Sequence, residues 1–183
     1  MKKLFEKVDL SAKQLAFTAL FAALCCIGTL VIAIPLPNGY FNTGDVFVLL
    51  AGWMLGPIGC VGAGIGSALA DVISGYTLYA IPTFFIKTID AFIAYMVWAF
   101  FKTIIKKETL DFLPRILSAI AGELVMVAGY FLFELVLYDF GGATLSLVGN
   151  FTQGACATVC AVIIISILYQ IKAVKNLFPI LKR

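Results

Sequence analysis

The chain has 183 residues, of which 62% are hydrophobic and 13% are charged, and its mean hydropathy is +1.06. Soluble domains contain about half apolar and about a quarter charged residues, so this composition excludes an ordinary soluble domain. A membrane-spanning helix needs about 20 apolar residues, and six crossings with short loops would use nearly the whole chain. We therefore predict a single transmembrane domain over residues 1–183, without a soluble catalytic domain.

Six apolar segments follow one another along the chain. The predicted spans are residues 15–34, 44–56, 58–73, 81–101, 116–137 and 145–170. A turn signal, PLPNG, ends the first span, and Tyr40–Asp45 is predicted to be a polar, aromatic loop. The second span is short for a crossing, so we expect it to be tilted, broken or partly re-entrant. Such a segment is tolerated where protein rather than lipid surrounds it.

The positive charges predict the orientation of this bundle. Twelve of the thirteen lysines and arginines fall in the N-terminal segment, in residues 102–115 and in the C-terminal tail. With six spans these three segments share one side of the membrane, which the positive-inside rule assigns to the cytoplasm. The prediction is an all-α integral membrane protein, a six-transmembrane-helix bundle with both termini cytoplasmic, in the plasma membrane of a prokaryote.

The sequence lacks the residues that several classes of protein usually require. The sequence contains no histidine, which is the commonest metal ligand and general base. Its five cysteines lie in apolar runs without metal-like spacing, so we expect no disulfide. The glycine-rich run at residues 59–66 is neither a P-loop nor a dinucleotide fingerprint, and it is typical of close helix packing. We expect no metal, no cofactor, no nucleic acid partner and no enzymatic activity.

Ionisable groups inside spans are the candidate functional residues, because placing a charge at the centre of a bilayer costs about 2.5–3.5 kcal/mol or more. In the last three spans the candidate site residues are Lys87, Asp90, Glu123, Tyr130, Glu134, Asn150 and Gln153. Within each span their spacing places them on one helical face. Three helices thus present polar groups at similar depth, most of them toward the outer side, and this pattern predicts a pocket open to the outside.

Each of these groups also has a structural interpretation. Lys87 and Asp90 would form an ion pair that fixes helix packing, and the amides of the sixth span would join helices by hydrogen bonds. Asp45 and Asp71 lie at span ends, and Asp45 would cap the short second helix. The tyrosines of the outer loops also fit an interfacial aromatic belt. The joint pattern favours a binding site.

Five dispersed motifs point to one family. In chain order they are NTGDVFVLLAGWMLGP, GSALADVISGY, PTFFIKTIDA, MVAGYFLFE and NFTQG. Together they resemble the substrate-binding S components of energy-coupling factor (ECF) vitamin transporters. The most similar branch is the riboflavin type, which includes hydroxymethylpyrimidine- and pyridoxine-type members. One position departs from the family pattern, because Asp90 stands where we expect a glutamate after the lysine of the fourth span.

The resemblance implies a vitamin site near the outer surface, built from the first extracellular loop and the last three helices. The expected substrate-binding residues are Tyr40, Asn42, Lys87, Asp90, Tyr130, Glu134, Asn150 and Gln153. The implied partner is an ECF module, which consists of a transmembrane coupling protein and two ATPases. By resemblance Ala19 and Ala23 form the small-residue face that docks on the coupling protein, and internal helix packing is the alternative.

The sequence thus predicts a capture subunit for a small heteroaromatic B vitamin or precursor, with pyridoxine or hydroxymethylpyrimidine favoured over riboflavin. Partner ATPases would supply ATP hydrolysis. The alternatives are a riboflavin-specific S component and a stand-alone proton-coupled secondary transporter, in which Lys87 and the buried acids relay protons. A membrane enzyme that uses Asp45, Asp71 or Glu123 is disfavoured, because nucleophile and metal motifs are missing.

Overall fold

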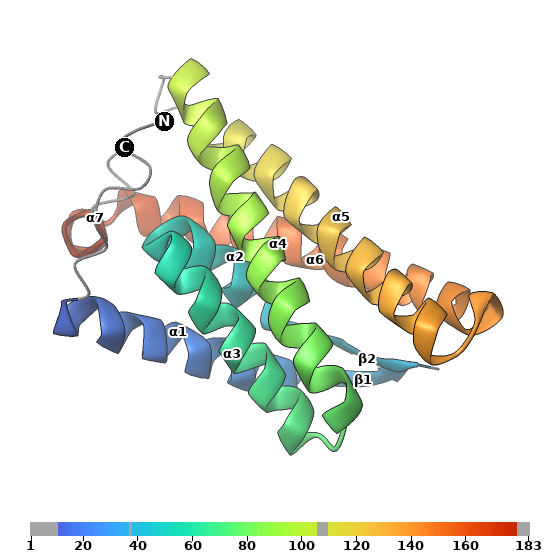
Figure 1. The fold of residues 1–183 in the computed structure, drawn as a ribbon. Coiled ribbons are helices and arrows are strands. Elements are labelled where there is room, and N and C mark those ends of the chain that lie inside the picture. The colour runs from blue at the N-terminus through green and yellow to red at the C-terminus, as the bar shows by residue number, and fades with distance from the viewer. Residues whose placement is uncertain (1–10, 37, 106–109, 179–183) are drawn as a thin grey trace.

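The computed structural model describes residues 11–36, 38–105 and 110–178, and these residues form a helical bundle with one hairpin (Figure 1). The helices are α1 (Ala12–Val31), α2 (Gly44–Leu55), α3 (Pro57–Ile73), α4 (Thr77–Ile104), α5 (Phe112–Leu137), α6 (Phe140–Gln170) and α7 (Lys172–Leu177). Between α1 and α2, the strands β1 (Ala33–Leu36) and β2 (Gly39–Asn42) pair antiparallel. A capping box fixes where α1 begins, because the backbone amide of Gln14 donates a hydrogen bond to the Ser11 side chain.

The hairpin differs from the sequence prediction, which extended the first span to Ile34 and placed a loop at Tyr40–Asp45. In the structure α1 ends at Val31, and Ala33 pairs with Asn42. Hydropathy cannot detect this change because the residues remain apolar, but Pro35 cannot continue a helix and disfavours helical geometry in the residue before it. The segment therefore becomes extended and pairs with the next polar stretch.

Four of the described helices, α1, α4, α5 and α6, are long and apolar enough to cross a bilayer, whereas α2 and α3 are shorter apolar helices. The 12 residues of α2 span about 18 Å, less than the ~30 Å hydrocarbon core. Every residue of α2 except Phe47 is buried, and α2 contacts α1, α3, α4 and α6. Protein rather than lipid thus surrounds the short second helix, which is the condition under which membranes tolerate one.

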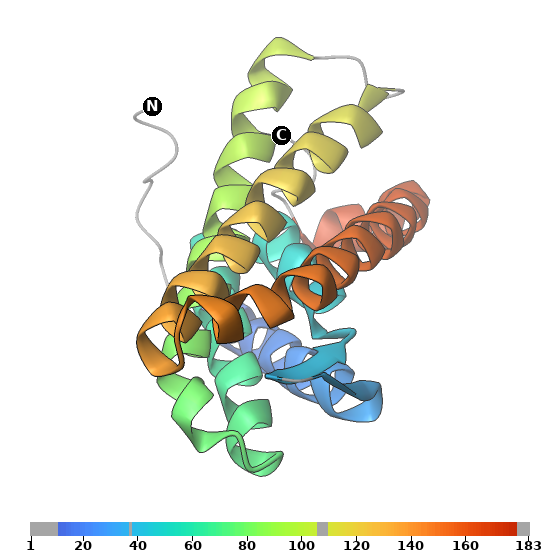
Figure 2. The ribbon, with the colours of Figure 1, turned by 90° about the vertical axis from the view of Figure 1, so that its right-hand side faces the viewer.

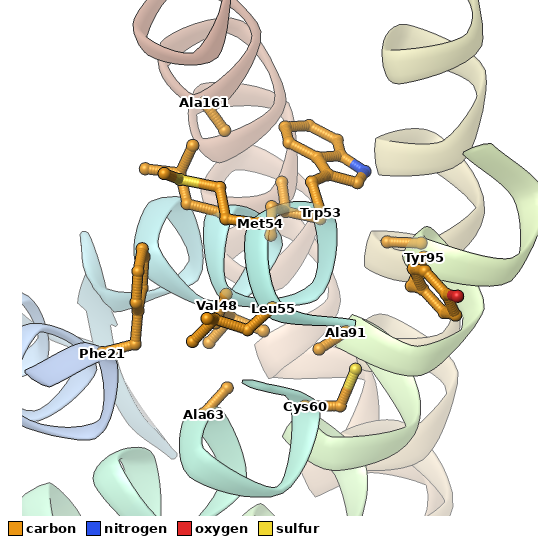
Figure 3. Packing of buried hydrophobic residues seen from close by; sticks show 14 of the residues in the cluster. Phe21, Val48, Trp53, Met54, Leu55, Cys60, Ala63, Ala91, Tyr95 and Ala161 are labelled. Atoms are coloured by element: carbon orange, nitrogen blue, oxygen red, sulfur yellow. The ribbon is translucent and has the colours of Figure 1, made fainter. Parts of the chain in front are cut away.

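The hydrophobic core is centred on α2. Figure 3 shows Trp53 and Met54 of α2 near Ala161 of α6, with Ala91 and Tyr95 of α4 nearby. Around this core the long helices expose large apolar side chains, such as Val136, which is 87% exposed. Small residues let the helices approach one another, as the glycine-rich run predicted. A Cβ at Gly66 of α3, for example, would collide with the carbonyl oxygen of Ala22 on α1.

The two ends of the bundle differ in composition. The hairpin, the turn between α3 and α4 and the turn between α5 and α6 lie at one end, hereafter the hairpin end (Figures 1 and 2). The start of α1, the end of α4, the start of α5 and α7 lie at the opposite, basic end. The described cations at these basic-end elements are Lys13, Lys102, Arg115, Lys172 and Lys175. The other cations of the three basic segments lie outside the described residues.

Candidate binding site

A cavity lined largely by polar side chains lies at the hairpin end of the bundle. Its walls come from the hairpin and from α1, α3, α4, α5 and α6. Seven of the eight residues expected to bind substrate line this cavity: Tyr40, Asn42, Lys87, Tyr130, Glu134, Asn150 and Gln153. The tertiary fold thus gathers side chains that are more than 100 positions apart in the sequence.

Asp90 is the expected binding residue that does not line the cavity. It is fully buried, and its Oδ2 lies 4.0 Å from Lys87 Nζ. Glu123, which shares the polar face of α5, is also buried and lies outside the cavity lining. Helical spacing assigned both acids to the correct faces, but it carries no information about depth relative to the neighbouring helices.

Asp45 organises the base of the site, a role that the cap interpretation missed. The N-cap position of α2 belongs to Thr43, and the Asp45 side chain enters the bundle instead. Its Oδ1 contacts the Lys87 ammonium, and its Oδ2 accepts a 2.6 Å hydrogen bond from Gln153 Nε2. The carboxylate is 1% exposed and joins α2, α4 and α6. The sequence did not indicate this pairing, because Asp45 lies in a first helical turn and no cation is near it in the chain.

Hydrogen bonds fasten the hairpin to α6. The backbone amide of Asn42 donates to Gln153 Oε1 at 2.8 Å, and the Asn42 side-chain amide donates to the same oxygen at 3.2 Å. In the turn between β1 and β2, Asn38 Nδ2 donates to the carbonyl oxygen of Gly142 at 2.5 Å. Because Gln153 also donates to Asp45, one amide side chain connects the hairpin to the charged base of the cavity.

Two tyrosine–carboxylate pairs form the wall on either side of α4. Tyr40 Oη donates to Asp71 Oδ1 at 2.7 Å, and Tyr79 Oη donates to Glu134 Oε1 at 3.1 Å. Burial, together with the Asp71 carboxylate beside it, raises the pKa of the Tyr40 phenol, so this hydroxyl stays protonated and acts as a donor. Asp71 and Tyr79 were not among the expected binding residues, because their positions at the ends of spans fitted structural roles equally well.

The expected docking residues occupy a different surface. Ala19 and Ala23 are exposed on α1 and line an apolar groove between α1 and α3, together with Ile65 and Leu69 of α3. This groove shares no lining residue with the cavity. Its small side chains leave the backbone of α1 accessible to another apolar helix.

A helical membrane bundle with a cavity lined by polar side chains at one end is typical of a membrane protein that binds a small molecule. Residues 9–170 match the model of the family described as "ECF-type riboflavin transporter, S component". The chain therefore belongs to the ECF S-component family, which confirms the resemblance seen in its motifs. It is the substrate-capture subunit of a vitamin transporter that associates with an ECF module, and it is not an enzyme.

A protein of Pyrococcus woesei, named "Uncharacterized protein in gap 3'region", is 35% identical over 130 residues. These residues cover 69% of this chain and 82% of that protein.

Proposed function

We propose that this chain captures a small, water-soluble heteroaromatic B vitamin or precursor, with pyridoxine or hydroxymethylpyrimidine preferred over riboflavin. The observation that carries this proposal is the lining of the cavity, in which hydrogen-bonding side chains come from the hairpin and from five helices. A compact ring with several hydroxyl or amino substituents can satisfy such groups on all sides. Riboflavin is larger, because it combines a tricyclic ring with a ribityl chain, and it requires a longer slot.

The cavity opens to the outside in this proposal, and six helices cross the membrane with both termini in the cytoplasm. The described cations at the basic end support this orientation through the positive-inside rule. The chain forms one domain, from residue 1 to residue 183. The captured ligand is delivered when an ECF module, formed by a transmembrane coupling protein and two ATPases, hydrolyses ATP.

The side chains divide into two sets within the proposed site. Asn150, Glu134 and the Asn42 side chain bond the ring substituents, while the Tyr130 ring stacks on the ligand. Lys87 lies 5.5 Å from the centroid of that ring, at the base of the cavity. Asp90 acts behind Lys87 by orienting its ammonium group and does not contact the ligand.

Isothermal titration of the purified chain in detergent with pyridoxine, hydroxymethylpyrimidine and riboflavin tests the proposal. We expect tight binding of one of the first two, and a loss of more than about tenfold in Lys87→Met, which breaks the base of the site. Asp139→Asn is the matched control, because Asp139 is an exposed acid that caps α6 and asparagine caps equally well. If riboflavin alone binds, the riboflavin-specific alternative holds; if none binds, the proposal fails.

A proton-coupled transporter is the second candidate, and the buried acids favour it. Both carboxylate oxygens of Asp90 and of Glu123 are buried and have no hydrogen-bond partner in the described part of the chain. Intramembrane carboxylates of this kind are typical of proton relays. Uptake by the chain alone, in liposomes with an imposed proton gradient, would support this candidate. Uptake that requires the ECF module and ATP would exclude it.

A further inference from the structure

The charges around the cavity do not balance. Lys87 is the only cation among the cavity-lining residues that the structure describes, whereas Asp71 and Glu134 are both carboxylates in the same lining. Lys87 is itself engaged by Asp45 and has Asp90 at 4.0 Å. Its positive charge is therefore already neutralised within the protein, and neither lining carboxylate forms an ion pair with a cation of the described residues.

Each of these two carboxylates has one oxygen without a hydrogen-bond donor among the described residues. Asp71 Oδ1 and Glu134 Oε1 accept the tyrosine hydrogen bonds described above. Their second oxygens, Asp71 Oδ2 and Glu134 Oε2, are buried and accept no hydrogen bond within the described residues. The two side chains are 6% and 1% exposed. A buried carboxylate without a full set of donors is costly, so both positions call for a donor or a positive charge from the ligand.

Four aromatic rings line the same cavity, those of Tyr40, Tyr76, Tyr79 and Tyr130. Their ring centroids follow one another at 5.0 Å, 6.3 Å and 6.5 Å in this order. A cage of aromatic rings attracts an organic cation through the negative faces of the rings. Hard metal ions prefer a shell of oxygen ligands, so rings combined with carboxylates favour a protonated nitrogen over a metal.

From this arrangement we infer that the site selects a ligand carrying a positively charged nitrogen, held between Asp71, Glu134 and the tyrosine cage, and that it rejects phosphorylated forms of the same ring. This inference rests on the proposed function, because it specifies the charge of the vitamin-like ligand. A phosphate group would meet the same carboxylates and would find Lys87 already paired, so electrostatic repulsion disfavours it. A protonated amine or ring nitrogen would instead donate charge-assisted hydrogen bonds to the Asp71 and Glu134 carboxylates.

The test compares ligands that share one ring and differ in charge. Purified chain in detergent is titrated with pyridoxine, with pyridoxamine, whose amine is cationic, and with pyridoxamine 5′-phosphate, and riboflavin is included as a neutral ring of another shape. We expect pyridoxamine to bind about tenfold or more tighter than pyridoxine, and the phosphate ester to bind most weakly. In Glu134→Gln and in Asp71→Asn this preference for the amine should shrink to about threefold or less, whereas Asp139→Asn should retain it.

The outcomes separate this inference from the proposed function. If pyridoxine binds as tightly as pyridoxamine, or if the phosphate ester matches its parent amine, the inference is wrong while the proposed function stands. If no member of the panel binds the wild-type chain, the inference fails; if hydroxymethylpyrimidine, titrated alongside, does not bind either, the proposed function fails with it. The comparison of ligands on the wild-type chain remains decisive even if one of the two variants does not fold.

Discussion

The Lys87 ammonium lies closer to Asp45, 42 positions earlier in the chain, than to Asp90, its ion-pair neighbour one turn along the same helix at 4.0 Å. This pair ties α4 to the first turn of α2, the short helix at the centre of the core. Gln153 of α6 completes the connection through its 2.6 Å hydrogen bond to the same carboxylate. The base of the cavity and the packing of α2 are consequently one structural unit.

The ion pair predicts strong coupling between Asp45 and Lys87. Removing either charge alone leaves the other buried and uncompensated, which costs about 3–5 kcal/mol in soluble proteins. We expect Asp45→Asn and Lys87→Met each to lower the melting temperature in detergent, and the double variant to lose clearly less than the sum of the two. Additive losses would show that the two side chains act independently. Asp139→Asn should leave the melting temperature near that of the wild type.

The hydrogen bonds of Gln153 are expected to hold the hairpin against α6. Replacing it with methionine preserves the approximate volume but removes the acceptor of the Asn42 backbone amide and the donor to Asp45. We expect hydrogen exchange in residues 39–42 to accelerate about tenfold or more, because the hairpin can then separate from α6. Thr152→Val, one position earlier on an exposed face of α6, serves as the control. Unchanged exchange in Gln153→Met would mean that other contacts hold the hairpin.

The basic end contains a second buried charge pair, and it predicts a pH dependence of stability. The Arg115 guanidinium is 1% exposed, lies 4.9 Å from the Trp98 ring centroid, and its Nε donates to Asp111 Oδ2 at 2.8 Å. Burial alone would raise the pKa of Asp111, but Arg115 and Lys102 outweigh it and lower that pKa below its usual 3.8. The pair therefore stabilises the fold fully above about pH 4, and this contribution disappears as the pH falls through the lowered pKa.

We expect Asp111→Asn to destabilise the protein by about 3 kcal/mol at pH 7, since it leaves Arg115 without a buried counter-charge. The gap in melting temperature between variant and wild type should stay constant from pH 7 to about pH 5 and narrow below pH 4. Thermal unfolding in detergent across this range measures it. A gap that is already closed at pH 7 would show that Arg115 does not depend on Asp111.

Because the groove between α1 and α3 is separate from the cavity, filling it should impair transport and leave ligand binding unchanged. Ala19→Trp fills this groove with a large ring, so we expect ligand affinity to stay within about twofold of the wild type while vitamin uptake by cells that carry the ECF module falls at least tenfold. Val159→Trp is the matched control, because Val159 is 59% exposed on α6, away from the groove. Normal uptake in Ala19→Trp would remove the docking role from this surface.

The distribution of charge allowed much of the site to be predicted without coordinates. Polar residues at helical spacing on α4, α5 and α6 stand out against an apolar background, because a bilayer penalises each of them. Lys87, Glu134 and Gln153 were recognised in this way, and all three line the cavity. Asp71 and Asp45 were not, since an acid near the end of a span is explained equally well by a cap or by the headgroup region.

The sequence by itself determined the membrane class, the family and the faces of the helices that carry polar groups, because hydropathy, helical period and local motifs are properties of short segments. Only the tertiary structure decided which groups meet. The Lys87–Asp45 pair, the hairpin bonded to Gln153 and the exclusion of Asp90 from the cavity all depend on the depth and rotation of one helix against another. Those quantities are set by packing around α2, between residues about 40 to 110 positions apart, and no local pattern encodes them.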